Sequence, residues 1–399
     1  MEMKVSPDLT NDTRAKRRIT ILGATGSVGC NTLDLVRNQP DQFAIEALTG
    51  NKNVDLLISQ AKEFTPKLAV IGDDALYGEL KDGLSGTDIA AASGQAAMLE
   101  AADVPSEIVI AGIVGVAGLA PTLKAAQRGV IVALANKECL VCAGDFFLDE
   151  IEHSGATLLP IDSEHNAIFQ VFDFDQAENV DHLTLTASGG PFRNASLTEM
   201  LAVTPEQAVV HPNWDMGAKI SVDSATMMNK GLELIEAFYL FPVEEKQIDI
   251  LIHPQSVIHS MVSYKDGSVL AQLGTPDMRT PISYALAWPE RMETPGRKLD
   301  LAQIGKLTFE TPDLERFPAL TLARDTLKAG GSLPTILNAA NEIAVRCFLE
   351  ERIGFLDITW VAAEVLNRTP KSEPNALDEI SHCDEAARVL AEEVVGAMT

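Results

Sequence analysis

Two acidic residues near the middle of the chain are the first candidates for chemistry. The apolar segment LLPI at 158–161 leads directly into DSEH at 162–165. If the apolar segment is a strand, Asp162 and Glu164 lie two positions apart at its end and share one face. Two carboxylates held close together repel each other without a cation, and a few hard oxygen ligands suit Mg²⁺ or Mn²⁺. The pair therefore predicts a metal site, with a solvated strand end as the alternative.

A second group of polar residues lies in the stretch SVDSATMMNKGLELIE at 221–236. Lys230 stands near a predicted helix start, and Ser224 and Asn229 lie upstream of it, so the three could hold a phosphate by charge and hydrogen bonds. Glu233 or Glu236 could supply a third metal-binding carboxylate, and the spacing does not choose between them. The alternative is an amphipathic helix with an exposed acidic face.

Two smaller features accompany these groups. The sequence SGG at 188–190 follows the strand-like run 182–187, so Ser188 and its neighbouring N–H groups could contact a phosphate or could form a simple turn. His253 and His259 flank another strand-like segment. We expect both histidines to be satisfied core or interface residues rather than ligands.

A glycine-rich loop follows the first apolar run of the chain. The sequence GATGSVG at 23–29 comes after the strand-like residues 18–22 and opens a helical pattern. The backbone N–H groups and the helix dipole of such a turn can face a pyrophosphate. The spacing G-x-x-G-x-x-G departs from G-x-G-x-x-G, but its context predicts a dinucleotide site, with a tight structural turn as the alternative.

The end of the second predicted strand bears on the choice of dinucleotide. NAD-binding versions of this fold usually carry an acidic residue there, which binds the ribose 2′-hydroxyl. Here the tip reads TGNKN at 49–53, and Glu46 lies three residues before the strand end. Lys52 and the amides beside it, including Asn53, suit a 2′-phosphate and favour NADPH, whereas the alternative is a plain polar turn.

The order of the predicted elements indicates an α/β protein. Short apolar runs alternate with helical stretches in the first 135 residues, as is typical of a parallel sheet covered by helices. Beyond about residue 160 the strand-like runs predict a mixed α+β domain, and proline and glycine residues then mark a linker. Helices follow, notably at 334–350. The predicted strands are 18–22, 43–48, 68–71, 108–111, 130–134, 183–186, 248–252, 257–262 and 268–272.

Length and charge restrict the function further. A chain of 399 residues exceeds the roughly 250–300 at which one hydrophobic core stops growing, so two or three domains are expected. The formal charge of −26 argues against nucleic-acid binding, and no apolar run approaches the ~20 residues needed to span a bilayer. Five scattered cysteines fit a reducing compartment, and Cys139 and Cys142 are expected to be buried rather than redox-active. We therefore expect a cytoplasmic enzyme with neither nucleic acid nor membrane as a partner.

Taken together, these segments resemble the 1-deoxy-D-xylulose 5-phosphate reductoisomerase family from about Arg18 to the C-terminus. The most specific motifs are LANKE at 134–138, DSEHNAIFQ at 162–170, HPNW at 211–214, the stretch 221–233 and HPQSVIHS at 253–260. The resemblance implies synthesis of 2-C-methyl-D-erythritol 4-phosphate in the non-mevalonate isoprenoid pathway. The sugar skeleton is first rearranged and the resulting aldehyde is then reduced by NADPH, with Mg²⁺ or Mn²⁺ as the metal. Asn51 stands where a glycine is common in the family, which leaves the chemistry intact.

The resemblance also implies roles for individual residues. It implies a metal site of Asp162, Glu164 and Glu233, which selects Glu233 over Glu236, and it gives catalytic roles to Lys137, Glu164 and His211. The NADPH contacts that it implies are Thr25, Gly26, Ser27, Val28, Lys52, Asn53, Asn136, Glu138 and Gly217. The implied substrate contacts are Lys137, Ser163, Glu164, Ser188, His211, Trp214, Ser224, Asn229, Lys230 and Glu233, with the phosphate held chiefly by Ser188, Ser224, Asn229 and Lys230.

The family organisation implies a homodimer whose subunits have three domains. The expected divisions are a disordered arm at 1–18, a Rossmann-like NADPH domain at 19–162, a catalytic domain at 163–289, a linker at 290–312 and a helical domain at 313–399. Residues 208–219 are expected to form a flexible lid, because prolines, glycine and polar residues surround the single large aromatic Trp214. Two other functions remain possible from the residues alone: a metal-independent NADP dehydrogenase, in which Asp162 and Glu164 are structural, and a dinucleotide-sensing regulator without turnover.

Overall fold

The computed structural model describes residues 15–214 and 216–398. The contacts of the chain divide it into two compact units. Unit 1 consists of residues up to 136 together with 147–161 and 278–296, and unit 2 consists of 137–146, 162–277 and 297 onward. Most of the expected N-terminal arm, residues 1–14, lies outside the described residues, and so does Asp215 of the expected lid.

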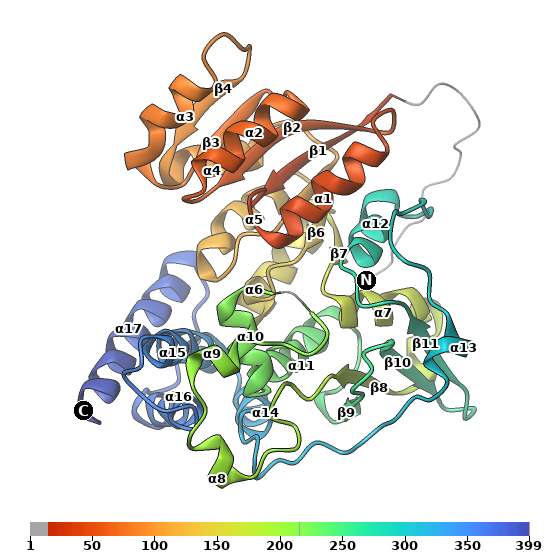
Figure 1. Ribbon diagram of the computed structural model, residues 1–399, viewed down its shortest axis with the longest axis vertical. Coiled ribbons are helices and arrows are strands. Elements are labelled where there is room, and N and C mark those ends of the chain that lie inside the picture. Colours follow the sequence, from red (N-terminus) through yellow and green to blue (C-terminus); the bar gives the residue numbers. More distant parts are fainter. Residues whose placement is uncertain (1–14, 215, 399) are drawn as a thin grey trace. The chain divides into compact units, whose positions relative to one another are not determined.

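Unit 1 is built on a seven-stranded sheet whose neighbouring strands are parallel (Figure 1). The strand order is β4-β3-β2-β1-β5-β6-β7, so the chain reverses its direction of travel across the sheet between β1 and β5. Open parallel sheets bind ligands at such a reversal, beyond the carboxyl ends of the strands. The strands are β1 (Arg17–Leu22), β2 (Phe43–Gly50), β3 (Leu68–Ile71), β4 (Ala90–Ser93), β5 (Ile108–Ala111), β6 (Ile131–Leu134) and β7 (Thr157–Pro160).

Helices connect these strands, as the alternating sequence pattern predicted. The central strands β1 and β5 carry fully buried apolar side chains, including Ile19, Ile21 and Ile110, as expected where helices cover both faces of a parallel sheet. The helices are α1 (Ser27–Asn38), α2 (Val54–Phe64), α3 (Tyr77–Gly83), α4 (Gly94–Asp103) and α5 (Leu119–Ala126), with short 3₁₀ turns η1 (Asp74–Leu76) and η2 (Val116–Gly118). The Rossmann-like part of the expected fold is confirmed.

The boundaries of the two compact units differ from the expected domain boundaries at 162 and 289 in the regions of two helices. Helix α12 (Arg279–Ala287) packs against α1, β6 and β7, and Arg279 Nη1 pairs with Asp34 Oδ2 at 3.1 Å, so residues 278–296 belong to unit 1. Helix α6 (Glu138–Ser154) runs from unit 2 into unit 1 and has non-helical backbone angles at Ala143. The division of the chain therefore follows packing rather than chain order.

Unit 2 contains a four-stranded mixed sheet of order β11-β10-β8-β9. β8 (Val180–Ala187) pairs in parallel with β9 (Ile248–Ile252), and β10 (Ile258–Tyr264) runs antiparallel to β8 and to β11 (Val269–Leu273). Helix α7 (Ser163–Val171) packs on β8, β10 and β11, and α11 (Met228–Leu240) packs on β8 and β9. This is the mixed α+β region that the sequence predicted.

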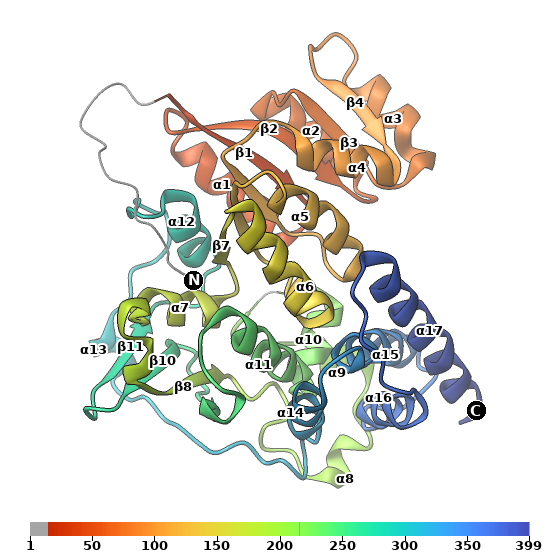
Figure 2. The same ribbon diagram turned by 180° about the vertical axis from the view of Figure 1, so that it is seen from behind.

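The rest of unit 2 is helical. In the C-terminal part, α15 (Leu333–Leu349) packs against α14 (Ala319–Ala329), α16 (Asp357–Arg368) and α17 (Leu377–Gly396), as Figure 2 shows. The short helices are α8 (Leu197–Met200), α9 (Pro205–Ala208), α10 (Ala218–Ala225) and α13 (Leu301–Ile304), with 3₁₀ turns η3 (Phe174–Asn179) and η4 (Glu245–Gln247). Among the described residues, no helix has the length and apolar character needed to cross a membrane.

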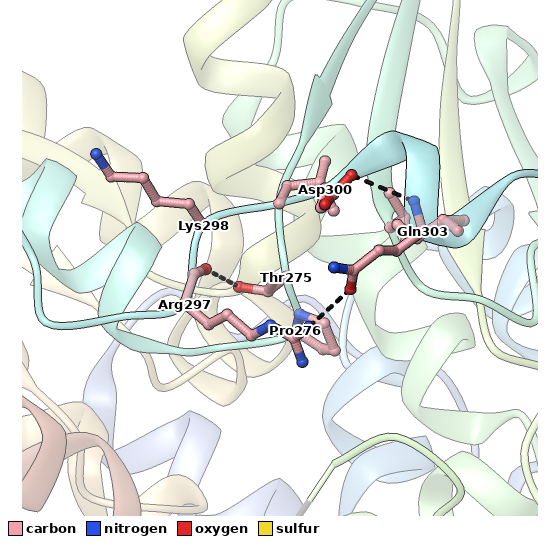
Figure 3. A pocket seen from close by; sticks show the side chains of 9 residues that line it. Thr275, Pro276, Arg297, Lys298, Asp300 and Gln303 are labelled. Carbon is pink, nitrogen blue, oxygen red and sulfur yellow. Dashed lines mark hydrogen bonds between the residues drawn. The ribbon is translucent and has the colours of Figure 1, made fainter.

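A pocket of about 220 Å³ in unit 2 is lined by residues that include Thr275, Arg297 and Gln303 (Figure 3). Its polar groups bond to one another: Thr275 Oγ1 donates to the Arg297 carbonyl at 2.9 Å, and Arg297 Nη2 donates to Gln303 Oε1 at 3.0 Å. None of its lining residues is among the expected metal, cofactor or substrate contacts. The pocket therefore gives no support to the expected site.

Candidate active site

The glycine loop in unit 1 is shaped by its backbone. Gly23 adopts φ 91°, and its N–H donates to Thr49 Oγ1 at 2.9 Å, while the Ala24 N–H donates to the Thr49 carbonyl at 2.7 Å. Helix α1 begins after Gly26 with no side-chain cap, which leaves the first N–H groups of Ser27 and Val28 available to an anion. The expected cofactor contacts Thr25, Gly26, Ser27 and Val28 all belong to this loop and the first turn of α1.

The tip of β2 has the polar character that the sequence indicated. Strand β2 ends at Gly50, and exposed Lys52 and Asn53 follow it. The Asn53 side chain accepts the Leu56 N–H at 3.2 Å and so caps α2. Glu46 is buried and pairs with Lys67 at 2.7 Å, which holds its carboxylate in a structural role and leaves the tip without an acidic residue for a ribose 2′-hydroxyl.

The other expected cofactor contacts are divided between the two units. Asn136 belongs to unit 1, where its Nδ2 donates to the Gly115 carbonyl at 3.0 Å and its buried Oδ1 has no hydrogen-bond partner. Glu138 begins α6 and Gly217 is the N-cap of α10, and both belong to unit 2. An unsatisfied buried amide oxygen beside a nucleotide-binding sheet fits a polar ligand group.

Asp162 and Glu164 lie at a helix N-terminus, so the expectation that they share one face of a strand end is wrong. Strand β7 ends at Pro160, and Asp162 is the N-cap of α7, where its Oδ1 accepts the Glu164 N–H at 3.4 Å. Asp162 is a good capping residue because its carboxylate satisfies an N–H group that the helix leaves free. The two carboxylates still converge, through a cap rather than through strand alternation.

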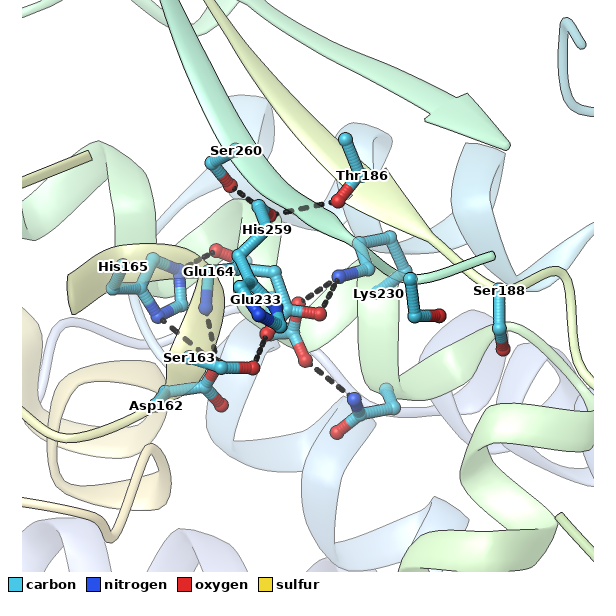
Figure 4. Close-up of polar contacts among 12 residues, drawn as sticks. Asp162, Ser163, Glu164, His165, Thr186, Ser188, Lys230, Glu233, His259 and Ser260 are labelled. Atoms are coloured by element: carbon cyan, nitrogen blue, oxygen red, sulfur yellow. Dashed lines mark hydrogen bonds and ion pairs between the residues drawn. The ribbon is translucent and has the colours of Figure 1, made fainter. Parts of the chain in front are cut away.

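Glu233 completes a trio with these residues (Figure 4). Asp162, Glu164 and Glu233 each place a carboxylate oxygen within 4.8 Å of the others. Glu233 lies on α11 and its side chain is almost fully buried. An all-oxygen group of this size is the kind of donor set that Mg²⁺ or Mn²⁺ uses, so the residues fit the expected metal.

Two lysines balance the charge of the trio. Lys137 Nζ lies 2.7 Å from Asp162 Oδ2 and 3.2 Å from Glu233 Oε1, and it donates to Asn229 Oδ1 at 2.9 Å. Lys230 Nζ lies 2.7 Å from Glu164 Oε1 and also contacts Glu233. Both ammonium groups are buried, so each would be strongly unfavourable without these carboxylates.

Burial and neighbouring charges shift the protonation of the trio in opposite directions. Burial would raise the pKa of Asp162, but Lys137 and His165 hold it well below its usual range. Burial, and then the nearby Glu233 carboxylate, raise the pKa of Glu164 to about 7. Neighbouring carboxyl groups with divergent pKa values are typical of sites that bind metals or move protons.

A buried ion pair behind the trio was missed by sequence reasoning. His165 Nδ1 lies 3.1 Å from Glu236 Oε2, and His165 Nε2 donates to the Glu233 carbonyl at 2.8 Å. Burial would lower the pKa of His165, but Glu236 outweighs burial and raises it to about 9. Glu236, which lies one turn after Glu233 on α11, therefore pairs with His165. The sequence feature that could have pointed to Glu236 was its spacing of three residues from Glu233, which places both on one side of the helix.

Two of the expected phosphate contacts, Ser188 and Ser224, lie on segments of unit 2 that pack against each other. Gly189 and Gly190 adopt positive φ in the turn after β8, and a Cβ on Gly190 would stand 2.7 Å from the Ser224 carbonyl, so the Ser188 turn packs directly against the end of α10. Ser188 Oγ lies 2.9 Å from His211 Nε2. Asn229 and Lys230, at the start of α11, contact carboxylates of the trio.

The segment expected to be a lid is irregular between α9 and α10. His211 Nδ1 accepts the N–H groups of Asn213 and Trp214 at 3.2 and 3.0 Å, so His211 Nε2 is the nitrogen that donates to Ser188. Asn213 Nδ2 donates to the Pro254 carbonyl at 2.9 Å and to Ser256 Oγ at 3.0 Å. Asn213 is a second residue that sequence reasoning missed, and it ties this segment to the loop between β9 and β10.

The two histidines expected in the core are indeed buried. His253 Nδ1 donates to the Thr308 carbonyl at 2.9 Å, and its Nε2 accepts the Val257 N–H at 3.2 Å, so both ring nitrogens are satisfied. Burial lowers the pKa of His259 to about 4, and its ring lies 6.2 Å from that of Trp214. Cys139 and Cys142 are also buried, as expected.

The parts now combine into a class of protein. A doubly wound parallel sheet with a glycine loop at its point of reversal binds dinucleotides, and the acidic trio elsewhere in the chain fits a divalent cation. Together these features define a dinucleotide- and metal-dependent oxidoreductase. Comparison with known proteins makes the assignment specific.

The chain belongs to the 1-deoxy-D-xylulose 5-phosphate reductoisomerase family. The family model of that description matches residues 19–144, and models described as its C-terminal domain match 158–241 and, as the DXP reductoisomerase C-terminal domain, 273–390. A 1-deoxy-D-xylulose 5-phosphate reductoisomerase of Rhodospirillum centenum is 57% identical over 397 residues, which cover 100% of this chain and 99% of the relative. The resemblance drawn from the sequence motifs is confirmed.

Solved structures agree with this assignment. The reductoisomerase of Zymomonas mobilis in complex with NADPH is 52% identical, with a TM-score of 0.90, and the match covers 95% of this chain and 98% of that one. A DOX-P reductoisomerase in complex with NADPH, fosmidomycin and magnesium is 44% identical, with a TM-score of 0.91 and coverage of 96% and 99%. NADPH in both of these proteins and magnesium in the second are the cofactor and one of the metals that the sequence predicted.

Proposed function

We propose that this chain converts 1-deoxy-D-xylulose 5-phosphate to 2-C-methyl-D-erythritol 4-phosphate with NADPH and a divalent metal ion. The observation that carries the proposal is the convergence of Asp162, Glu164 and Glu233 with Lys137 and Lys230. It occurs in a chain that is 57% identical to a named reductoisomerase over its whole length. The enzyme would act in non-mevalonate isoprenoid biosynthesis.

The three carboxylates would hold the metal, and the glycine loop, Lys52 and Asn53 would hold NADPH, with Asn136, Glu138 and Gly217 as further contacts. When bound, the metal supplies Lewis-acid stabilisation of negative charge on substrate oxygens, and NADPH supplies the hydride. Lys52 would favour NADPH by pairing with the 2′-phosphate, because the strand tip offers that group a cation and no carboxylate.

Lys137 would orient a substrate oxygen by a hydrogen bond, and Glu164 would bind and release a proton. Lys137 Nζ stands between Asp162 and Glu233, from which it can donate a hydrogen bond to a substrate oxygen near both. Glu164, with Ser163 donating to its carboxylate, has a pKa near neutrality before a cation binds and can release its proton when one arrives. With that proton released, all three carboxylates of the trio would be ionised and could bind the metal.

Ser188, Ser224, Asn229 and Lys230 would hold the phosphate of the substrate. The arrival of a phosphate would give Lys230 a second anionic partner beside Glu164, and a metal would take over the carboxylate charge that Lys230 now balances. His211 and Trp214 would close over the sugar as part of the lid at 208–219 and exclude water. The donation from His211 Nε2 to Ser188 already links this segment to the phosphate side.

The wider organisation follows the family. We propose a homodimer in the cytoplasm with the three-domain division at 19–162, 163–289 and 313–399, joined by the linker 290–312. Sedimentation of the purified chain would give the mass of two 42.9 kDa subunits if the dimer forms.

An absorbance assay tests the function directly. Purified protein, 1-deoxy-D-xylulose 5-phosphate and Mg²⁺ or Mn²⁺ should consume NADPH and yield the branched tetrol phosphate, and a chelator should stop the reaction. Undiminished turnover in the chelator would favour the metal-independent dehydrogenase, in which Asp162 and Glu164 are structural. NADPH binding without consumption would favour the dinucleotide-sensing regulator.

A further inference from the structure

A partly buried network of opposite charges connects α10 to the C-terminal helices of unit 2. Lys219, in the first turn of α10, places Nζ 2.9 Å from Asp223, 3.5 Å from Glu138 and 4.0 Å from Glu342. The Asp223 carboxylate is almost fully buried and also accepts a hydrogen bond from Asn341 Nδ2, on α15, at 2.7 Å. Lys219 is therefore the cation that three carboxylates from α6, α10 and α15 share.

Arg388 extends this network further into the C-terminal helices. It lies 2.6 Å from Glu342 and 2.6 Å from Asp384, so its partners stand on α15 and α17. The Lys219 and Arg388 side chains have matching exposure, 27% and 28%. The two cations thus belong to one network and are similar in environment, but only Lys219 touches α6 and α10.

The position of Lys219 along the chain gives this network its significance. Lys219 comes two residues after Gly217, the N-cap of α10, and so it stands where the proposed lid joins regular structure. Asn213 fastens the middle of the lid to Pro254 and Ser256 by neutral hydrogen bonds. The C-terminal end of the lid is held by the charges around Lys219, because burial of Asp223 and Glu138 without a nearby cation would be unfavourable.

We propose that Lys219 is the residue that positions the C-terminal end of the lid, by fixing the first turn of α10 against Glu138 and Asp223. A lid closes productively only when the residues at its ends keep their backbone geometry. The same helix carries Ser224 on its last turn, so displacement of α10 would also move a proposed phosphate contact. This inference rests on the proposed function and its lid, and it adds a residue that contacts neither substrate nor metal.

The test compares Lys219→Met with Arg388→Met in the full-length protein. Each substitution removes one cation from the same network, but only the first releases α10. Lys219→Met should raise both the KM for 1-deoxy-D-xylulose 5-phosphate and the Kd for fosmidomycin, measured with Mg²⁺ and NADPH, by about tenfold, as is typical of coupling between sites. Arg388→Met should lower the melting temperature and leave both constants unchanged, and Lys219→Arg should behave as the unmodified protein does.

Limited proteolysis gives a readout that does not depend on turnover. Fosmidomycin should protect residues 208–219 of the unmodified protein and of Arg388→Met, and it should protect Lys219→Met poorly at the same concentration. If Lys219→Met does not fold, Asp223→Asn serves in its place, because it weakens the hold on Lys219 and keeps the side-chain volume.

Two results would overturn the inference. The first is wild-type fosmidomycin affinity and protection in Lys219→Met or, in its place, Asp223→Asn. The second is an equal loss of fosmidomycin affinity in Arg388→Met, which would show that the network is purely structural. Failure of the unmodified protein to turn over substrate or to bind fosmidomycin would instead reject the proposed function, so the two failures are distinguishable.

Discussion

The glycine loop of unit 1 and the acidic trio of unit 2 are built in different ways. The loop takes its shape chiefly from its backbone, with Gly23 at positive φ and the Ala24 N–H held by the Thr49 carbonyl. The trio is held by side-chain charges from three segments that are distant in sequence: Lys137 pairs with Asp162 and with Glu233. A site built from backbone should keep its ligand affinity when a neighbouring side chain changes, and should lose it when a glycine gains a side chain that collides with the backbone. A site made of charges should fail when any one charge is removed.

Loss of the Glu233 charge is the largest effect that we expect. Glu233→Gln should lower turnover by at least about 10²-fold, the order seen when a group that stabilises developing charge is lost. Calorimetric titration should show a matching loss of Mg²⁺ affinity, because the trio then offers one charge fewer to the cation.

Glu236→Gln is the matched control for Glu233→Gln on the same helix. Glu236 faces His165 rather than the centre of the trio, so its loss should reduce activity by about tenfold, as for groups that orient metal ligands. An inactive Glu236 variant beside an active Glu233 variant would show that the trio has been assigned to the wrong glutamate.

Addition of a single methyl group should damage the glycine loop. A Cβ on Gly29 would lie 2.4 Å from Ala24 Cα and 2.4 Å from the Gly23 carbonyl oxygen, so the backbone of the loop must move. Overpacking of this kind costs about 1–3 kcal/mol. Gly29→Ala should therefore lower the melting temperature and weaken NADPH binding in a fluorescence titration.

Gly78→Ala on α3 controls for the substitution itself. A Cβ there would have no neighbouring atom within 4 Å, so alanine should be neutral or should stabilise by up to about 1 kcal/mol through helix propensity. Wild-type NADPH affinity in Gly29→Ala would contradict the view that backbone packing builds the loop.

Cofactor choice is the one property of the loop region that we assign to a side-chain charge. Lys52→Glu should weaken NADPH at least about tenfold more than NADH, a difference of roughly 1.4 kcal/mol, because a carboxylate would repel the 2′-phosphate. Lys62→Glu reverses the same charge at an exposed position further along α2 and should leave the ratio unchanged. Equal catalytic efficiency of the unmodified enzyme with the two cofactors would refute the assignment.

The same contrast explains what the sequence could and could not predict. The glycine loop and the individual strands of the parallel sheet have local signatures, such as the run 18–22 followed by Gly23, so local patterns were sufficient to locate them. The pairing of His165 with Glu236 joins residues 71 positions apart, and that of Lys219 with Glu138 joins residues 81 positions apart. No local pattern carries such contacts, since burial creates them when the helices pack.

Local patterns also failed where one residue type serves two kinds of structure. Asp162 follows an apolar strand, which suggested a strand end, but aspartate is equally suited to cap a helix and does so for α7. Helix α12 reads as part of the catalytic segment in chain order, yet its packing on α1 brings it into unit 1. Sequence motifs identified the members of the trio, and only the fold revealed how their charges are balanced.

The smallest effect concerns how the stability of the metal-free protein depends on pH. Burial and Glu233 raise the folded-state pKa of Glu164 to about 7, above the value of about 4.3 for an unfolded chain. Between these values the folded state binds a proton that the unfolded state has lost, so stability falls as pH rises through this window. Asp162 titrates below the window because its pKa is lowered. The raised pKa of His165 makes stability depend on pH only above about pH 6.5, where its stabilising contribution begins to be lost. Glu236, whose pKa burial also raises, adds a slope of the same sign, so only the difference between two proteins isolates Glu164.

The melting temperature of the unmodified protein in chelator should decrease between pH 4.5 and 6.5 by a few degrees more than that of Glu164→Gln. Mg²⁺ should favour the ionised carboxylate and reduce this difference, whereas parallel melting curves for the two proteins would show that the charge of Glu164 is not suppressed in the folded state.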